Sequence, residues 1–306
     1  MLTNEQFIEL LKANITTALG GQASAQDANE FIDLAVEQTQ VLGKIRVETG
    51  IKTSMNLDSI ELGEPAMVAG TEGTAPASAD VVTPTINRKV LQPVEVLNAF
   101  NVSFSFLRRN IEGQRVNETL NRIFAKRFGK DTVLVAFNGD TANVGTSRTD
   151  KALKCVSGYY KQFASDTDIH EYTVASTDYL KTVFPGMLEQ LPKDYKDDRE
   201  MLGLFVSPDV AEAYGQQVGL RETVFGDQVM TTLVYPRFRG IEVIPVYGND
   251  DSQMILTPKK NLAIGYGLEM TIGRDIYYRT RLIEVTITAE FDAKYAVSDA
   301  IVYGHA

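Results

Sequence analysis

The sequence of this 306-residue chain predicts an α+β fold, and three patterns lead to that class. Residues 115–140 form an amphipathic segment, residues 283–291 alternate strictly between apolar and polar side chains, and helix and strand patterns alternate through residues 158–267. A helix over 115–140 would cover the apolar face of a strand over 283–291. The block between them is then an inserted domain, and the rest of the chain forms a helix-on-sheet domain.

The N-terminal residues 1–50 predict an arm of two short helices. Thr3 fits a helix N-cap, and apolar residues follow at helical spacing up to Gly20 and Gly21. A second helical pattern begins at Ser24 and is expected to stop near Gly43.

Residues 51–106 predict a long extended loop. Strand-like flanks at 51–60 and 88–106 enclose a segment, 63–85, that is rich in Gly, Pro, Ala and Thr. That segment contains three acidic residues, Glu64, Glu72 and Asp80, and no Lys or Arg. We interpret the region as a two-stranded excursion that contacts a partner; a surface loop without a partner is the alternative.

The central helix follows. Unbroken from 115 to 137, it would span about 35 Å. Gly129 and the β-branched residues after it weaken its second half, so a kink or a fully buried end is the alternative there.

Residues 158–267 predict a small α+β domain. A helix beginning at Ser176 meets Pro185 and Gly186, and Ser207 followed by Pro208 is typical of a helix start. His170 is expected in an exposed loop and the sequence Gly265-Tyr266-Gly267 in a turn. Strands are predicted at 201–206, 230–235, 241–247, 254–257 and 262–266.

Composition narrows the function. The chain has 30 Lys and Arg residues and 40 Asp and Glu residues, which gives a formal charge of -10. This negative charge argues against a broad attraction to nucleic acid. Cys155 is the single cysteine, which excludes an intramolecular disulfide and a cysteine-only metal cluster. No apolar run approaches the roughly 20 residues that cross a bilayer and no secretory signal is evident, so a soluble intracellular protein without a membrane partner is expected.

The motifs that support catalysis are missing from the sequence. It contains no Gly-x-Ser-x-Gly, no Walker sequence and no Gly-x-Gly-x-x-Gly. Two histidines, His170 and His305, cannot build a multi-histidine metal site. The pairs Asp197-Asp198 and Asp250-Asp251 are weak candidates for a cation, and Cys155 is expected to be an inert thiol despite nearby lysines. We therefore predict no enzyme activity, no catalytic residue, no cofactor and no metal.

A weak interface signal appears late in the chain. Arg274, Arg279 and Arg281 flank Tyr277 and Tyr278, and Arg with Tyr is the composition typical of protein interfaces.

The order of these features resembles a known family. An arm, a long extended loop, a spine helix ending in Phe137-Asn138-Gly139-Asp140, an inserted domain and a return through long strands are similar to the major capsid proteins of tailed bacteriophages, the Hong Kong 97-type shell fold. The local marks are Asn138-Gly139-Asp140 and two pairs of segments: 187–192 leading to 204–208, and 240–246 leading to 256–262.

The resemblance implies a domain division and a fold. It implies a spine helix packed on long antiparallel strands, with an inserted axial α+β domain, an extended hairpin loop and an N-terminal arm. The expected boundaries are 1–50 for the arm, 51–106 for the loop, 107–157 and 268–306 for the peripheral domain, and 158–267 for the axial domain.

The resemblance also implies a function. Subunits would assemble into hexamers and pentamers of an icosahedral shell around double-stranded DNA, in a virion capsid assembled in the host cytoplasm. Packaged DNA would be a weak, non-specific neighbour, and a separate scaffolding protein, a portal and decoration proteins would be further partners. An encapsulin-like compartment shell is the close alternative, and a soluble α+β enzyme is a lower-ranked one.

Candidate inter-subunit contacts follow from the loop and the late basic strand. A scaffold fused at the N-terminus is not expected because only about 50 residues precede the loop, and covalent cross-linking is doubtful because the loop tip has no lysine. The candidate contact residues are Glu64, Glu72, Arg88, Lys89, Arg274, Tyr277, Arg279 and Arg281.

Overall fold

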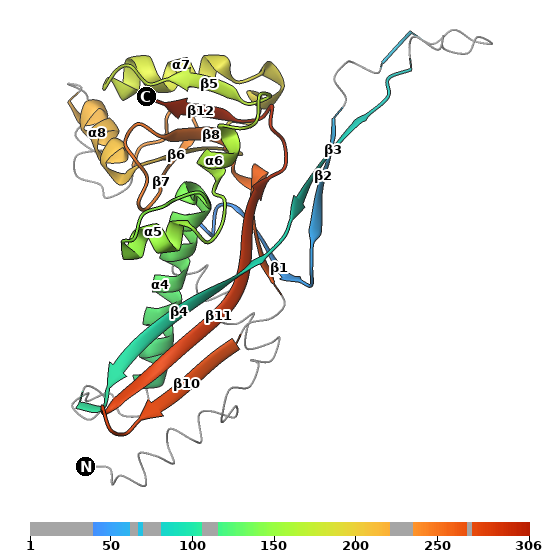
Figure 1. Ribbon diagram of the computed structural model, residues 1–306. Helices are drawn as coiled ribbons and strands as arrows, with labels where there is room; N and C mark the ends of the chain where they lie inside the picture. Colours follow the sequence, from blue (N-terminus) through green and yellow to red (C-terminus); the bar gives the residue numbers. More distant parts are fainter. Residues whose placement is uncertain (1–38, 62–66, 70–80, 106–115, 221–234, 268–270) are drawn as a thin grey trace.

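The computed structural model describes residues 39–61, 67–69, 81–105, 116–220, 235–267 and 271–306. In these residues the chain forms two five-stranded sheets and one two-stranded hairpin (Figure 1). The strands are β1 (Arg46–Ile51), β2 (Met55–Glu61), β3 (Thr85–Leu91), β4 (Val94–Ser103), β5 (His170–Thr173), β6 (Leu202–Val206), β7 (Glu242–Pro245), β8 (Met254–Pro258), β9 (Leu262–Gly267), β10 (Thr271–Tyr277), β11 (Leu282–Tyr295) and β12 (Val302–His305).

Helices cover both five-stranded sheets. They are α4 (Val116–Asn138), α5 (Arg148–Leu153), α6 (Tyr159–Phe163), α7 (Phe184–Gln190) and α8 (Pro208–Gly219), with a π-helical turn at Tyr179–Val183 and 3₁₀ turns at Lys193–Tyr195 and Lys259–Asn261. The α+β class predicted from the sequence is confirmed by this arrangement.

The first sheet and α4 form the predicted spine. The sheet has the order β1-β9-β11-β10, and β4 pairs with the edge of β11 opposite to β10. Every second residue of β11 from Ile283 to Phe291 is buried, as its alternation predicts. Phe124 of α4 stacks on Phe100 of β4 with ring centroids 4.5 Å apart. The buried side chains of α4 and of β11 belong to the same apolar core, as the sequence predicts for the central helix and the late strand.

The spine helix is continuous. α4 runs for 23 residues through Gly129 without a break, and its second half is largely buried, as one of the two alternatives predicts. Gly129 and the β-branched Thr132 and Val133 are all buried, and tertiary packing of that end outweighs their low helix propensity.

The second sheet has the order β5-β12-β8-β6-β7 and is covered on both faces. One face packs on α7 and α8 through residues such as Leu204 and Met254. The other face packs on the end of α4, where Phe137 lies 5.8 Å from Phe205 and 5.1 Å from Tyr159 between ring centroids. β6 is buried along its whole length for this reason.

The sheets do not follow the expected boundary at 267/268. β9 pairs with β1 and β11 and so belongs to the spine sheet, and the last strand, β12, pairs with β5 and β8 in the second sheet. The chain therefore crosses back after β11. β12 has four residues and no alternation of apolar and polar side chains, so its sequence does not indicate which sheet it joins.

Two local expectations are wrong. Gly265, Tyr266 and Gly267 lie inside β9 and not in a turn, because side chains from Ile51, Leu91 and Glu290 fill the space beside the two glycines. His170 starts β5, and its Nε2 lies 3.0 Å from the Asp299 carboxylate.

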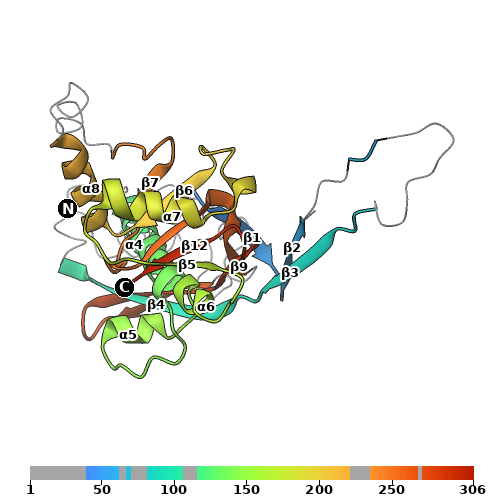
Figure 2. The same ribbon diagram turned by 90° about the horizontal axis from the view of Figure 1, so that it is seen from above.

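The extended loop is shorter than expected. β2 and β3 pair in antiparallel register from Met55↔Leu91 to Glu61↔Thr85, and they project from the body (Figures 1 and 2). β4, expected in the same loop, instead belongs to the spine sheet. Of the predicted arm, residues 1–38 lie outside the described residues, as do 62–66 and 70–80 of the loop and most of the strand expected at 230–235.

Candidate functional site

The described residues contain no cluster of three or more His, Cys, Asp or Glu side chains that could hold a metal ion. Burial raises the pKa of the Cys155 thiol, and its Sγ donates to the Lys151 carbonyl oxygen; both favour the protonated thiol. Across the described part of the chain, no helix has the length and apolar character to cross a membrane.

The most unusual surface is the outer face of the β2–β3 hairpin. Ile60 and Ile86 lie directly opposite each other and are 70% and 62% exposed, and Val90 on the same face is also exposed. Cross-strand apolar pairs stabilise a sheet when something covers them, whereas these project into solvent. An isolated two-stranded hairpin is also marginally stable in water. This face is therefore suited to contact another molecule.

Arg88 lies within this face and is already paired. Its guanidinium Nε donates to the Asp58 carboxylate at 2.7 Å across the hairpin, and that ion pair raises the pKa of Arg88. On this face the pair lies between Ile60 and Ile86 on one side and Val90 on the other. Glu64 and Glu72, also predicted as contacts, lie outside the described residues.

The opposite face of the hairpin is fastened to the body at its root. Leu57 and Leu91 are fully buried there against Ile51 and Ala263, in a small core separate from the two main ones. Gly265 of β9 leaves room for the methyl groups of Ile51 and Leu91. Each buried leucine contributes about 1.5–3 kcal/mol to the free energy of unfolding, which holds the hairpin at a defined place on the sheet.

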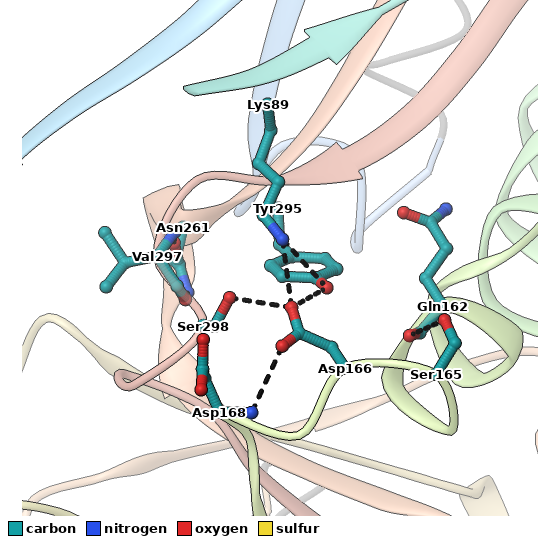
Figure 3. A network of polar contacts seen from close by, with 9 residues as sticks. All are labelled: Lys89, Gln162, Ser165, Asp166, Asp168, Asn261, Tyr295, Val297 and Ser298. Carbon is teal, nitrogen blue, oxygen red and sulfur yellow. Dashed lines mark hydrogen bonds and ion pairs between the residues drawn. The ribbon is translucent and has the colours of Figure 1, made fainter. Parts of the chain in front are cut away.

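A polar network joins the root to two distant segments (Figure 3). The Oδ2 atom of Asp166, on the turn after α6, accepts from Lys89 Nζ at 2.9 Å, from the Tyr295 hydroxyl at 2.6 Å and from the Ser298 hydroxyl at 2.8 Å. Its Oδ1 accepts the Asp168 N–H at 3.2 Å. Burial raises the pKa of Asp166, but these hydrogen bonds outweigh burial and hold it well below its usual range.

Lys89 is thus an anchor of the hairpin within its own subunit. Besides the Asp166 contact, its Nζ lies 4.7 Å from the centroid of the Tyr295 ring. Whether it also contacts another copy stays a prediction.

A second carboxylate fixes the bend between the hairpin and β4. Asp292 Oδ2 accepts the backbone N–H of Gln92 at 2.8 Å, at the point where β3 ends and β4 is about to begin. Burial raises the pKa of Asp292, and the hydrogen bonds from Gln92 and Ala293 oppose that rise. The hairpin root is therefore held by an apolar core and by two carboxylates from the body.

The predicted late interface residues gather around the β10–β11 turn. Tyr277, Arg279 and Arg281 are exposed there together with Tyr278, and Arg281 has a left-handed backbone with φ of 55°. For Arg274 the structure gives the backbone, which pairs with Val285. The turn lies at the far end of the spine sheet from the second sheet (Figure 1).

Sequence reasoning did not find Asp166, Tyr295 or Asp292. No local pattern marks Asp166, because the lysine and tyrosine that bind it are 77 and 129 residues away along the chain. The signal in the sequence for Asp292 is its position directly after Phe291, the last apolar residue of the alternation in β11.

Known proteins are similar to this chain in sequence and in fold. No family model matches the sequence. A Bacillus subtilis (strain 168) protein, named provisionally as prophage capsid protein YqbE, is 24% identical over 312 residues, covering 98% of this chain and 97% of its own. The structure is similar to the satellite phage P4 procapsid that includes the size determination (Sid) protein, with a TM-score of 0.66, 15% identity and coverage of 99% and 98%.

Two other solved structures share the fold. A subunit of the cyanophage A-1(L) capsid has a TM-score of 0.57 at 12% identity, covering 95% of this chain and 98% of its own. A virus-like particle from Pyrococcus furiosus has a TM-score of 0.55 at 12% identity, with coverage of 90% and 96%.

The chain has the Hong Kong 97-type capsid fold. The B. subtilis relative and the capsid neighbours support a structural protein of a capsid shell and not an enzyme. The neighbours are shells built from many subunits, which supports homo-oligomeric assembly of this chain.

Proposed function

We propose that this protein is the major subunit of an icosahedral capsid, which assembles through hexamers and pentamers around double-stranded DNA. The observation that carries the proposal is the hairpin: it exposes the apolar pair Ile60 and Ile86 on one face while Lys89 and Leu91 fasten the other face to the body. A hairpin that is anchored at its root and apolar on its outer face is suited to lie across a neighbouring copy.

The sheets suggest how the subunit is divided. In the proposed shell the spine sheet with α4 forms the peripheral domain, and the second sheet with α7 and α8 forms the axial domain near the capsomer centre. β9 goes with the peripheral domain and β12 with the axial domain, because sheet pairing and not chain order defines the units.

The DNA contact is proposed to be weak and non-specific. A formal charge of -10 repels the phosphate backbone on average, so the shell would confine DNA more than bind it. Assembly in the host cytoplasm, and a separate scaffolding protein, portal and decoration proteins, belong to the same proposal.

Electron microscopy of the purified protein tests the proposal. We expect closed shells or ring-shaped capsomers, and persistence of monomers in every salt and crowding condition would overturn it. A variant lacking residues 63–85 should fold, as judged by circular dichroism and its unfolding midpoint, yet form no particles. The contents of particles isolated from the native source separate a DNA-filled capsid from a compartment shell that encloses protein.

A further inference from the structure

Asn261 ties together two of the connections that carry the chain between the second sheet and the spine sheet. The 3₁₀ turn Lys259–Asn261 leads from β8 to β9, and residues 296–301 lead from β11 to β12. Asn261 is 6% exposed. Its Nδ2 donates to the Val297 carbonyl oxygen at 2.9 Å, and its Oδ1 accepts the Val297 N–H at 2.8 Å. The side-chain amide therefore pairs with the later connection as a neighbouring strand would.

Asn261 is in turn fixed to the second sheet. Its Nδ2 also donates to Oγ1 of Thr257, a fully buried residue of β8, at 3.0 Å. The Ala296 N–H donates to the backbone carbonyl oxygen of Asn261 at 3.0 Å. Both hydrogens and the oxygen of the side-chain amide are thus used, so its loss would leave several polar groups without these partners. The contacts hold the middle of residues 295–298, a stretch that we call the junction.

The two ends of the junction bind the carboxylate that anchors the hairpin. The hydroxyls of Tyr295 and Ser298 donate to Asp166 Oδ2 at 2.6 and 2.8 Å, and Lys89 Nζ of β3 donates to the same oxygen at 2.9 Å. Figure 3 shows the junction between Asn261 and Asp166. One short stretch of backbone therefore meets the spine sheet, the second sheet and the root of the hairpin.

The junction is short enough to transmit a displacement. It has four residues, and the two whose hydroxyls bind Asp166 flank the two whose backbone binds Asn261. If Asn261 moves with the second sheet, it shifts the backbone between these hydroxyls. The carboxylate that they share with Lys89 then has to follow.

We propose that the junction couples the direction of the β2–β3 hairpin to the placement of the second sheet on the spine sheet. Asn261 is the positioning residue, which acts on Lys89 through the junction and Asp166. Because such a coupling is reciprocal, a contact that bends the hairpin also displaces the second sheet. The coupling belongs to the single subunit, so it goes beyond the proposed function and is tested without assembly.

Amide hydrogen exchange of the unassembled full-length subunit tests the coupling. Asn261→Ala should speed exchange of the backbone amides of β2 and β3 by roughly two- to tenfold, the range expected for residues of one hydrogen-bond network. Thr257→Val removes one acceptor of Asn261 and keeps the shape of the buried side chain. It should act in the same direction by a smaller factor, and it decides the question if Asn261→Ala does not fold.

A double variant shows whether the effect passes through the Asp166 carboxylate. In Lys89→Met/Asn261→Ala, the hairpin amides should exchange no faster than in Lys89→Met alone, because the contact through which Asn261 acts is already lost. Two independent effects would multiply instead.

Ser207→Ala is the matched control. Ser207 is a buried polar residue beside the second sheet, and its hydroxyl bonds with Val210 and Asp251. The variant removes the N-cap of α8 and should lower the unfolding midpoint. Exchange in the hairpin should stay at the wild-type rate, because this loss does not involve the junction.

The distance between two spin labels gives a second readout. Ile86→Cys on the hairpin and Glu189→Cys on α7 are exposed sites, and Cys155→Ala removes the single native cysteine. Pulsed electron paramagnetic resonance should show one narrow distance distribution in this background. Adding Thr257→Val should broaden or shift it, whereas adding Ser207→Ala should leave it unchanged.

Three results would overturn the coupling. The first is an unchanged hairpin, in exchange and in label distance, in both Asn261→Ala and Thr257→Val. The second is exchange in Lys89→Met/Asn261→Ala that equals the product of the two single factors. The third is an equal effect of Ser207→Ala on the hairpin, which would assign the change to general loss of stability.

Discussion

Lys89 and Asp166 are 77 residues apart in the chain, and their Nζ and Oδ2 atoms lie 2.9 Å apart in the structure. This contact joins the hairpin to the turn after α6, and Tyr295 and Ser298 share the same carboxylate oxygen. The direction in which the hairpin leaves the body is therefore set by contacts inside one subunit, before any neighbour arrives.

Replacing Lys89 with Met should loosen the root of the hairpin. Met keeps most of the aliphatic stem and removes the ammonium, and since the lysine side chain is 34% exposed the loss of stability should be modest, about 1 kcal/mol or less. Amide hydrogen exchange should become faster in β3. Arg88→Met, which breaks the exposed pair with Asp58, is the control and should leave exchange at the root unchanged.

Asp166→Asn should destabilise the subunit in a pH-dependent way. The pKa of Asp166 is lowered in the folded protein, so its stabilisation is present above the ordinary carboxyl pKa of about 4 and is lost as pH falls through the folded value. Denaturant unfolding of unassembled subunits should show a loss of about 1–3 kcal/mol at pH 7 that shrinks below about pH 4. The exposed Asp168→Asn is the control, and a pH-independent difference for Asp166→Asn would contradict this account.

Gly265→Ala should disturb the apolar core of the hairpin root. A Cβ at that position would lie 2.5 Å from Ile51 Cδ1 and 3.1 Å from Leu91 Cδ1, so both side chains would have to move, at a cost of about 1–3 kcal/mol. The matched strand variant Gly273→Ala meets no atom closer than 3.9 Å and should be neutral or slightly stabilising. Thermal unfolding of both variants compares the two sites, and equal midpoints would argue against close packing at the root.

Ile60→Asp/Ile86→Asp should separate assembly from folding. Both side chains are exposed in the single subunit, so its free energy of unfolding should change little, roughly 0.5 kcal/mol per site. Particle formation should fail, because two charges would enter an apolar contact. Val144→Asp introduces the same charge at a side chain that is 90% exposed in the loop after α4 and should still assemble. If the double variant forms normal shells, the outer face of the hairpin is not part of the interface between subunits.

Arg281→Gly should affect stability and assembly in opposite directions. Arg281 has φ of 55°, which glycine adopts without the steric cost of about 1 kcal/mol or more that other residues bear. The unfolding midpoint of the subunit should therefore rise. If the β10–β11 turn contacts a neighbour through Arg281, light scattering should show slower or weaker assembly. Unchanged assembly would limit Arg281 to a structural role in the turn.

The predictions that succeeded depended on long periodic patterns. The alternation from Ile283 to Phe291 identified a half-buried strand, the amphipathic stretch identified α4, and Ser207 before Pro208 marked the start of α8, where the serine hydroxyl accepts the Val210 N–H. Each pattern is formed by residues close together in the sequence, so it can be recognised without knowing which other segment packs against it.

The predictions that failed concerned short segments whose state depends on distant neighbours. Gly265 and Gly267 were expected in a turn because glycine is common there, yet β1 and β11 pair with both sides of that segment. His170 was expected in an exposed loop, yet it begins β5, which pairs with β12 in register from Val302↔His170.

By itself the sequence determined the class of fold, the spine of α4 on β11, the extended excursion and the absence of known catalytic motifs, because hydrophobic period and motif spacing are properties of neighbouring residues. Only the tertiary structure decided which sheet β9 and β12 join and how the hairpin is anchored. Those choices depend on contacts such as Lys89 with Asp166, whose energy exists only once distant segments have met.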